Sequence, residues 1–298
     1  MSSSLFIAVG HDGLRMTSPD GRSWSEPQLG KEGETFRQVC VGPRRCVAAG
    51  GYGGKNIFSA TSDGVQWEPS VSDAGYSRYV LGLVYGPAGF YGLSGDAGTV
   101  GNAKMEMLTS PDGVQWKKHP QDQARNVLRR AVIGHGLFVG IGDRGRRAWS
   151  TDGITWEDDK SSKPVDTLIS LAFGAGRFVG VGLHGLRMSS ADGKTWDDKQ
   201  LGEEGEHLNS VLWTGEQFVA VGLGATYVSL DGQTWQRYAN VDPPLSVAFG
   251  KLTTGERVFV GANWKGRLLR SGDGIAWEQT LRAPRHVEAV AFAAFADA

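Results

Sequence analysis

Histidine and carboxylate side chains that could act as a general acid and a general base are scattered along the sequence. Acid–base catalysis would need such groups to converge within reach of one substrate. Neither a His-x-His metal spacing nor a Gly-x-Ser-x-Gly motif occurs, and no phosphate-binding loop is present. The sequence therefore leaves catalysis open and indicates no metal and no cofactor. The catalytic candidates are His207, His286, Glu288, Asp166 and Asp143.

Arginines, histidines and aromatic residues form a second set, suited to binding. Guanidinium groups fork onto carboxylate or phosphate oxygens, and an aromatic ring can stack on the face of a sugar. This set predicts a site for an anionic or polyhydroxylated ligand; the alternative is that most of its members are solvated loop residues. The binding candidates are Arg37, Arg78, Arg129, Arg130, Asn209, His11, His184, Tyr52 and Trp264.

A repeated motif, Ser/Thr-x-Asp-Gly-x-x-Trp, determines where these residues lie, because it occurs seven times. Successive motif tryptophans are 43, 49, 40, 40, 39 and 42 residues apart, a period typical of propellers and solenoids. The motif aspartates are Asp20, Asp63, Asp112, Asp152, Asp192, Asp231 and Asp273. The motif tryptophans are Trp24, Trp67, Trp116, Trp156, Trp196, Trp235 and Trp277.

Short strand-like segments fill each interval between motifs. In one repeat they are residues 168–173, 177–182 and 186–190, and a fourth begins at Thr195 after the motif turn. Four antiparallel strands make one propeller blade, and helical periodicity is absent. We therefore expect an all-β, seven-bladed propeller that forms a single domain over residues 1–298.

The two ends of the chain predict how the ring closes. Residues 5–10 read as a second strand with no first strand before them, and residues 287–292 read as the missing first strand. The first blade should therefore be shared between about residues 1–28 and 285–298. Such pairing would remove an exposed sheet edge.

The motif itself has a mechanical explanation. Its aspartate can accept backbone N–H groups in a tight turn, its glycine can adopt a positive φ, and its serine or threonine can add a hydroxyl bond. Its tryptophan should bury a large ring where one blade meets the next. Seven calcium sites are disfavoured, because each motif has one carboxylate whereas calcium takes six to eight oxygens.

Ligand sites are expected on the opposite face, around the channel mouth. The loops from second to third strands, and from fourth strands to the next blade, open there and contain the candidates named above. From the second-strand end to the motif aspartate the seven connections have 10, 13, 18, 10, 10, 9 and 10 residues. The insertions in blades two and three, residues 51–56 and 95–104, indicate either a binding rim or neutral drift.

Composition excludes some partners. Lysine plus arginine total 31 and aspartate plus glutamate 32, so no excess charge favours nucleic acid or an anionic membrane. No stretch approaches the roughly 20 apolar residues of a membrane span, and the N-terminal apolar run is too short for a signal peptide. We expect a soluble, cytoplasmic monomer, unless a leader precedes the sequence.

The two cysteines, Cys40 and Cys46, flank a predicted hairpin turn. If Val41 pairs with Cys46, then Cys40 pairs with Val47 and the two thiols point to opposite sides of the sheet. A disulfide is therefore disfavoured, and two small buried side chains are expected.

The motif resembles the Asp-box, or BNR repeat, of sialidases, sortilin-type receptors, photosystem II assembly factors and several glycan hydrolases. The resemblance covers nearly the whole chain and implies the propeller fold. One departure is uniform: aspartate and glycine are adjacent in all seven copies, so the turn should be one residue shorter. An Arg-Ile-Pro signature is absent and sialidases have six blades, which disfavours a sialidase.

Two functions follow from these observations. The first is a binding propeller that holds a protein partner or a glycan on its loop face. The second is a carbohydrate-active hydrolase or lyase that acts on an acidic glycan at the channel mouth. A purely structural role in an oligomer is a third alternative.

Overall fold

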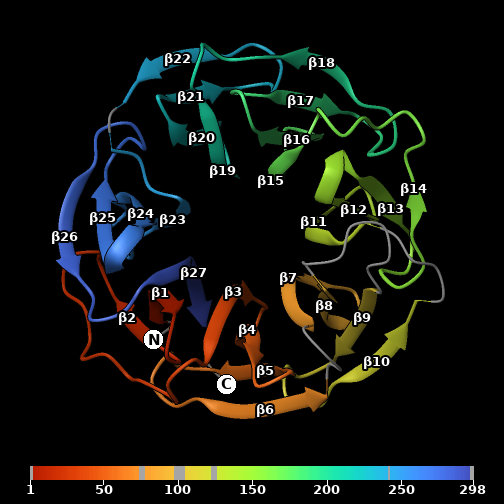
Figure 1. Cartoon of the computed structure of the whole chain (residues 1–298). Coiled ribbons are helices and arrows are strands. Elements are labelled where there is room, and N and C mark those ends of the chain that lie inside the picture. The colour runs from red at the N-terminus through yellow and green to blue at the C-terminus, as the bar shows by residue number, and fades with distance from the viewer. Residues whose placement is uncertain (1–2, 74–77, 97–104, 122–125, 241, 296–298) are drawn as a thin grey trace.

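The computed structural model is a closed ring of seven antiparallel blades around a central channel (Figure 1). It describes residues 3–73, 78–96, 105–121, 126–240 and 242–295. Helical structure in these residues consists of two 3₁₀ turns, η1 (Asp143–Gly145) and η2 (Trp264–Gly266), and none of it is long and apolar enough to cross a membrane. The predicted all-β, seven-bladed propeller is confirmed.

Each blade has its strands in the same order, from the first strand at the channel to the last at the outside. The first strands, in order from blade 1 to blade 7, are β27 (Val287–Phe295), β3 (Thr35–Val41), β7 (Arg78–Gly86), β11 (Leu128–Gly134), β15 (Leu168–Gly174), β19 (His207–Trp213) and β23 (Ser246–Lys251). The second strands are β1 (Ser3–Gly10), β4 (Cys46–Tyr52), β8 (Gly89–Asp96), β12 (Leu137–Gly142), β16 (Arg177–Gly182), β20 (Phe218–Leu223) and β24 (Arg257–Asn263). In β16 all residues from Phe178 to Gly182 are buried, because neighbouring blades cover both faces of the strand.

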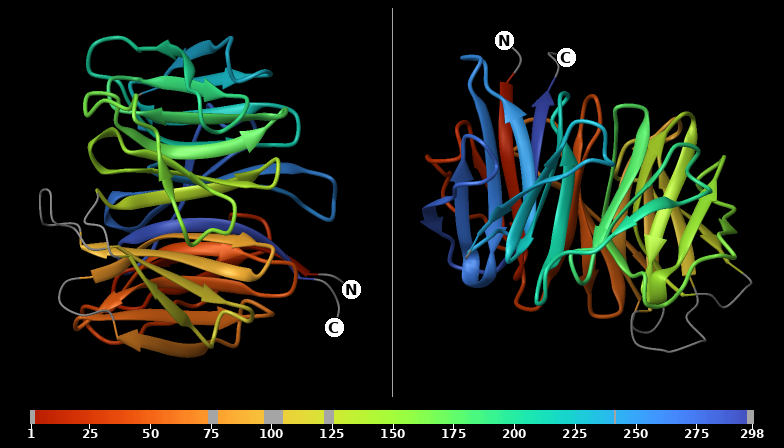
Figure 2. Two further views of the ribbon diagram at one scale, coloured as in Figure 1. Left: turned by 90° about the vertical axis from the view of Figure 1, so that its right-hand side faces the viewer. Right: turned by 90° about the horizontal axis from the view of Figure 1, so that it is seen from above.

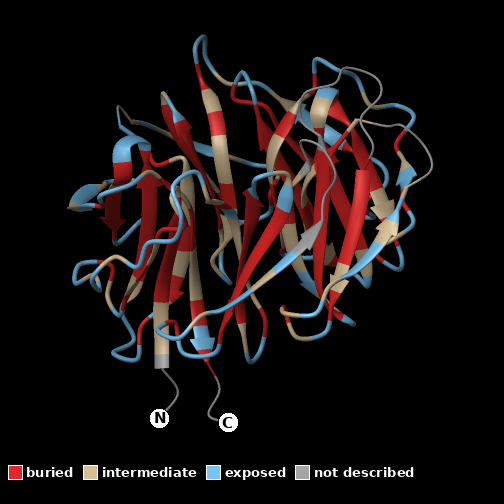
Figure 3. Ribbon diagram, turned by 60° about the horizontal axis from the view of Figure 1, so that its bottom comes forward, coloured by how far each residue is buried: buried red, intermediate tan, exposed pale blue. Residues whose placement is uncertain are grey.

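The outer strands are progressively more exposed (Figure 3). The third strands are β2 (Arg15–Ser18), β5 (Lys55–Thr61), β9 (Met105–Ser110), β13 (Arg147–Ser150), β17 (Arg187–Ser190), β21 (Ala225–Ser229) and β25 (Arg267–Ser271). The fourth strands, in blades 2 to 7, are β6 (Glu68–Asp73), β10 (Lys117–Pro120), β14 (Glu157–Asp158), β18 (Asp197–Gln200), β22 (Gln236–Ala239) and β26 (Glu278–Arg282). None of the four residues of β18 is buried.

Blade 1 closes the ring from both ends of the chain. Strand β27 pairs antiparallel with β1 from Ser3 opposite Phe295 to Gly10 opposite Val287. Figure 2 shows that the start of β1 and the end of β27 lie side by side on one face of the ring. The predicted closure is therefore confirmed. In place of a fourth strand this blade has an isolated bridge between Arg15 and Gln28.

The motif turns lie between third and fourth strands. In blade 6 the Asp231 Oδ1 accepts the N–H groups of Gln233 and Thr234 at 2.8 and 2.7 Å. The Ser229 hydroxyl donates to the same carboxylate and accepts the N–H of Gly232 at 2.8 Å. Equivalent bonds occur in the other six motifs, and the seven glycines have φ between 73° and 78°. The predicted role of the aspartate in the turn is confirmed.

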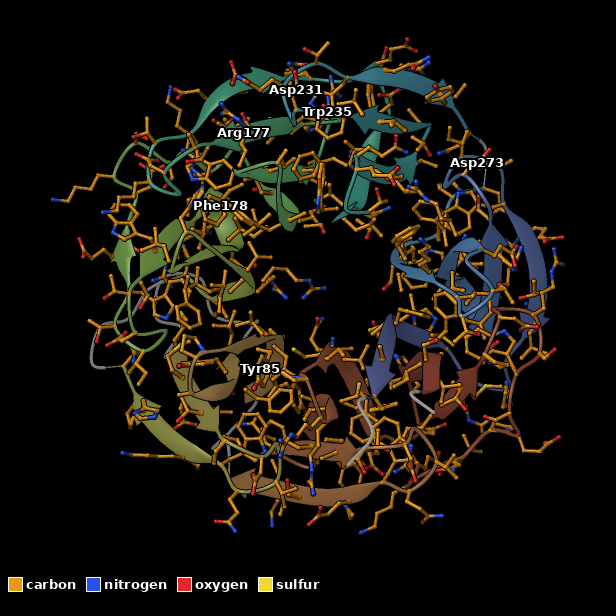
Figure 4. The ribbon with its side chains drawn as sticks, turned by 180° about the vertical axis from the view of Figure 1, so that it is seen from behind. Tyr85, Arg177, Phe178, Asp231, Trp235 and Asp273 are labelled. Carbon is orange, nitrogen blue, oxygen red and sulfur yellow. The ribbon has the colours of Figure 1, made fainter. Side chains whose placement is uncertain are left out.

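Each seam between blades holds one motif tryptophan. The hydrophobic core of the described residues divides into seven clusters, and every cluster combines residues of two adjacent blades with one of these rings. Figure 4 shows Asp231 and Trp235 in one blade, beside Arg177 and Phe178 of the blade before it. The motif therefore fixes a turn and supplies a seam residue at the same time.

The cysteines follow the predicted register. Cys40 pairs with Val47, Val41 pairs with Cys46, and both thiols are free. Burial raises the pKa of the Cys40 thiol to about 12, so it stays protonated at neutral pH.

Replacement of the motif glycine should open a seam. A Cβ on Gly232 (φ 75°) would lie 2.5 Å from Val179 Cγ2 in the preceding blade, whereas one on Gly136 (φ 73°) would meet nothing within 4 Å. Both alanine variants pay the left-handed backbone strain of about 1–2 kcal/mol. Gly232→Ala should cost about 1–3 kcal/mol more, from overpacking. Urea denaturation measures the difference; equal costs would contradict this role of the glycine.

Protonation of a motif aspartate should destabilise the fold. The N–H groups of Thr234 and Gln233 lower the pKa of Asp231 to about 2. A carboxylate with a lowered folded-state pKa stabilises the fold above its unfolded pKa, and this contribution is lost as pH falls toward the folded value. The difference in unfolding free energy between wild type and Asp231→Asn should shrink between about pH 4 and pH 2. A difference that stays constant with pH would contradict the assignment.

Candidate functional site

The loop face is built from turns of one geometry. Among the described loops between second and third strands, five contain two consecutive residues with positive φ. The residue after them pairs with the residue before them or donates its N–H to that residue's carbonyl. This is a type I′ turn, whose twist suits a β-hairpin. The pairs with positive φ are Asp12–Gly13, Gly53–Gly54, Arg144–Gly145, His184–Gly185 and Lys265–Gly266. The residues that open these turns differ in chemistry: His11, Tyr52, Asp143, Leu183 and Trp264.

A hollow of about 330 Å³ occupies the channel mouth; we call it the channel hollow. It brings together three arginines of the binding set and two carboxylates of the catalytic set, from three blades. They are Arg37, Arg129, Arg130, Asp143 and Glu288. The remaining wall is largely aliphatic, with Leu81, Leu168 and Ile169.

Two of these arginines already have partners. Arg129 forms a forked pair with Asp143, with Nη2 3.1 Å from Oδ2 and Nε also bonded to the carboxylate. Arg130 donates to the carbonyl oxygens of Leu81 and Arg129 at 2.7 and 2.9 Å. Burial, and then the charge of Arg129, lowers the pKa of Arg130 to about 10, so it remains a cation at neutral pH.

Arg37 and Arg130 have no carboxylate partner among the described residues, and Arg37 differs in that it also makes no hydrogen bond to the carbonyl groups that hold Arg130. Arg37 is exposed, and its guanidinium carbon lies 5.7 Å from the centre of the Tyr79 ring. Three arginines against two carboxylates give the hollow an excess of one positive charge. An anionic group of a ligand could therefore form a charge-assisted hydrogen bond with Arg37.

A second hollow, of about 590 Å³, lies on the same face over blades 5 to 7; we call it the tryptophan hollow. It brings together the predicted residues His207, Asn209 and Trp264. It is also lined by Leu183 and Leu223, which sequence reasoning missed. The residues Leu183, Leu223 and Trp264 are 37%, 51% and 64% exposed.

An ion pair forms one wall of the tryptophan hollow. Arg267 bonds both oxygens of Asp242, at 2.8 and 2.5 Å. The side chain of Asn263 donates to Asp242 at 3.2 Å and to the carbonyl of Pro243 at 2.8 Å. The Arg267 hydrogen bond lowers the pKa of Asp242, so the pair stays ionised at neutral pH. The wall is therefore held in place before any ligand arrives.

A cluster of two histidines and a glutamate lies where the two hollows meet. His11 Nε2 lies 2.8 Å from Glu288 Oε1, and the His11 ring packs edge-on against His286 at 4.9 Å. Trp264 stacks on His286 with ring centres 5.2 Å apart and planes at 11°. Burial lowers the pKa of His286, Glu288 raises it and His11 lowers it, with a net lowering.

Other predicted residues lie elsewhere. Asp166 is buried and paired with Lys199 at 2.5 Å, so it supports a loop and does not line either hollow. Tyr52 ends β4 at the hairpin tip of blade 2, outside both hollows. His184 lies beside the tryptophan hollow without lining it, and its backbone N–H donates to Nδ1 of His207 at 3.2 Å.

Part of the predicted rim lies outside the described residues. This applies to residues 97–104 of the blade 3 insertion and to the side chains of Arg78 and Asp96. His207 lines the tryptophan hollow, whereas Arg37 and Arg129 line the channel hollow. Of the acid–base candidates, Asp143 and Glu288 line the channel hollow together, His207 lines the other hollow, and Asp166 and His286 line neither.

The missed residues carried a signal in the sequence. Leu183 occupies the first position of the same turn as His11 and Trp264, and Leu223 ends the equivalent strand of the next blade. One exposed apolar residue is ordinary, but two at equivalent positions of neighbouring blades form a patch, which is typical of an interaction site. Alignment of the turns would have identified both leucines.

Comparison with known proteins places the fold. No protein-family model and no curated protein matches the sequence. Among solved structures, YCF48 bound to D1 peptide has a TM-score of 0.56 and 20% identity, over 82% of this chain and 80% of that chain. The computationally designed Ika8 protein has a TM-score of 0.58 and 13% identity, over 96% and 86%. At these identities the likeness shows the propeller fold alone.

The Arg129–Asp143 pair should show measurable coupling. Its side chains are 40% and 31% exposed, and its loss would leave Arg129 uncompensated beside Arg130. A double-mutant cycle with Arg129→Met and Asp143→Asn should give a coupling free energy of about 0.5–1 kcal/mol, reduced by salt. The more exposed Arg257–Glu216 pair on the opposite face provides the control and should give a smaller value. Equal coupling in the two cycles would contradict a special environment in the channel hollow.

Proposed function

We propose that this protein binds a protein partner through its loop face, with a segment of the partner lying across the two hollows. One observation carries the proposal: Leu183, Leu223 and Trp264 line one hollow and are all substantially exposed. Apolar side chains that gather in a surface hollow with a polar rim are typical of protein-binding sites, and tryptophan is enriched at their centres.

The two hollows favour a partner segment that has both an apolar and an acidic side chain. An apolar side chain of the partner would pack against Trp264, whereas a carboxylate would pair with Arg37, which has no acidic partner among the described residues. The His286 ring lies between the two hollows, because it stacks on Trp264 of one hollow and is two residues from Glu288 of the other. A short extended peptide could therefore use both.

The comparisons support a protein ligand. A similar fold, that of YCF48, has been solved bound to D1 peptide. The motifs of this chain also resemble the Asp-box repeats of photosystem II assembly factors, and their turns lie on the face opposite the two hollows. We treat residues 1–298 as one propeller domain that holds its variable loops on a fixed ring.

A catalytic role is less well supported. The two carboxylates of the channel hollow already have partners, since Asp143 is paired with Arg129 and Glu288 is bonded to His11. These contacts favour binding over acid–base catalysis at the channel hollow.

Selection of peptides from a random displayed library tests the proposal. Peptides enriched on the wild type should combine a large apolar residue with an acidic one. Their affinity should fall by at least about tenfold for Trp264→Ala and for Leu223→Ser, because a buried aromatic anchor and its neighbours carry most of the binding energy. Arg37→Ala should weaken binding and reduce its dependence on salt.

The matched control is Leu230→Ser, which removes a 71% exposed leucine from a motif turn on the opposite face. It should leave the affinity of the selected peptides unchanged. Peptides that bind Trp264→Ala as well as wild type would contradict the proposal. A glycan array that gives Arg129-dependent signals, with no peptide dependent on Trp264, would favour the glycan alternative instead.

A further inference from the structure

Three donor atoms of different residues converge at the closure of the ring. One nitrogen each of His11 and His286 and one oxygen of Glu288 lie within 4.8 Å of one another. The corresponding ligand–ligand distance in a tetrahedral zinc site is about 3.3 Å, from metal–ligand bonds of about 2.0 Å. Small torsional movements of the three side chains would close this difference.

The backbone holds these residues in register before any ion binds. His286 directly precedes β27, and Glu288 lies at a β-bulge near its start, because Gly10 pairs with Val287 and Val9 with Ala289. A bulge redirects a side chain, and here the Glu288 carboxylate reaches His11. His11 follows β1, and its N–H donates to the carbonyl of His286 at 3.0 Å. The cluster therefore joins the first turn of the chain to its last strand.

The cluster leaves lone pairs for a metal. Neither ring nitrogen of His286 makes a hydrogen bond to another described residue, and its Nδ1 is buried. Glu288 bonds His11 through one oxygen. Arg285, next to His286 in the chain, is paired with Asp12 at 2.5 Å, so its charge is compensated. Arg130 also interacts electrostatically with Glu288 and favours its ionised form, which is the form that binds a metal.

We propose that His11, His286 and Glu288 bind a divalent transition-metal ion of the zinc type. Two imidazoles and one carboxylate match the three-ligand sites that leave a fourth position for water or another ligand, and imidazole nitrogen selects such ions over magnesium or calcium. In the metal-free protein His11 donates its Nε2 proton to Glu288. When the ion binds Nε2 in place of this hydrogen bond, the neutral His11 ring carries its proton on Nδ1 instead. This inference is independent of the proposed function.

Calorimetric titration of the metal-free full chain with zinc chloride tests the site. The wild type should bind one equivalent with micromolar or tighter affinity and should show a higher unfolding temperature with zinc, since the ion binds only the closed ring. His286→Ala and the isosteric Glu288→Gln should each lose at least about tenfold in affinity and should lose the rise in unfolding temperature. Magnesium chloride should have no effect on either readout.

A control variant at a comparable turn distinguishes zinc binding at the proposed site from adventitious zinc binding by surface histidines. His184 has φ 58° and lies beside His207, with ring centres 5.4 Å apart. His184→Asn, which tolerates this φ, should bind zinc as the wild type does. Zinc binding that survives in Glu288→Gln, or that is lost in His184→Asn, or that is absent from the wild type, would overturn the proposal. If His286→Ala does not fold, Glu288→Gln decides alone.

Discussion

The pairing of β27 with β1 is the constraint on which the rest of the structure depends. No blade can bury both of its faces alone, and each of the seven core clusters is shared by two neighbours. Blade 1 obtains its first strand from the far end of the chain, so the two seams beside it form only when this pairing is made. The channel hollow, which Glu288 of β27 helps to line, also exists only in the closed ring.

The two faces of the ring have different tasks. On one face the motif turns are chemically uniform, because their aspartates, glycines and serines or threonines satisfy the turn and their tryptophans fill the seams. On the other face the type I′ turns keep their backbone geometry and vary their first residue. A rigid, repeated scaffold thus presents unlike side chains, which is how repeat proteins commonly generate binding surfaces.

The sequence predicted the fold more completely than the site. Motif spacing, strand order and the matching ends predicted the blades and their closure, because these depend on local turn chemistry and hydrophobic pattern. Prediction also placed Arg37, Arg129 and Arg130 around the channel mouth, since equivalent strand positions lie at equivalent heights. It could not show that Arg129 is paired with Asp143, nor that His11 meets His286. Those contacts depend on side-chain rotamers and on the registration of chain segments far apart in sequence.

Native-state hydrogen exchange on the intact chain tests most directly whether the pairing of β27 with β1 controls the stability of the whole ring. Amides that bridge β1 and β27, such as those between Ile7 and Ala291, should exchange only through global unfolding, with the same free energy and denaturant dependence as amides within the central strands β12 and β16. Exchange of the β1–β27 amides through a separate opening of lower free energy, while the other blades stay protected, would contradict this account.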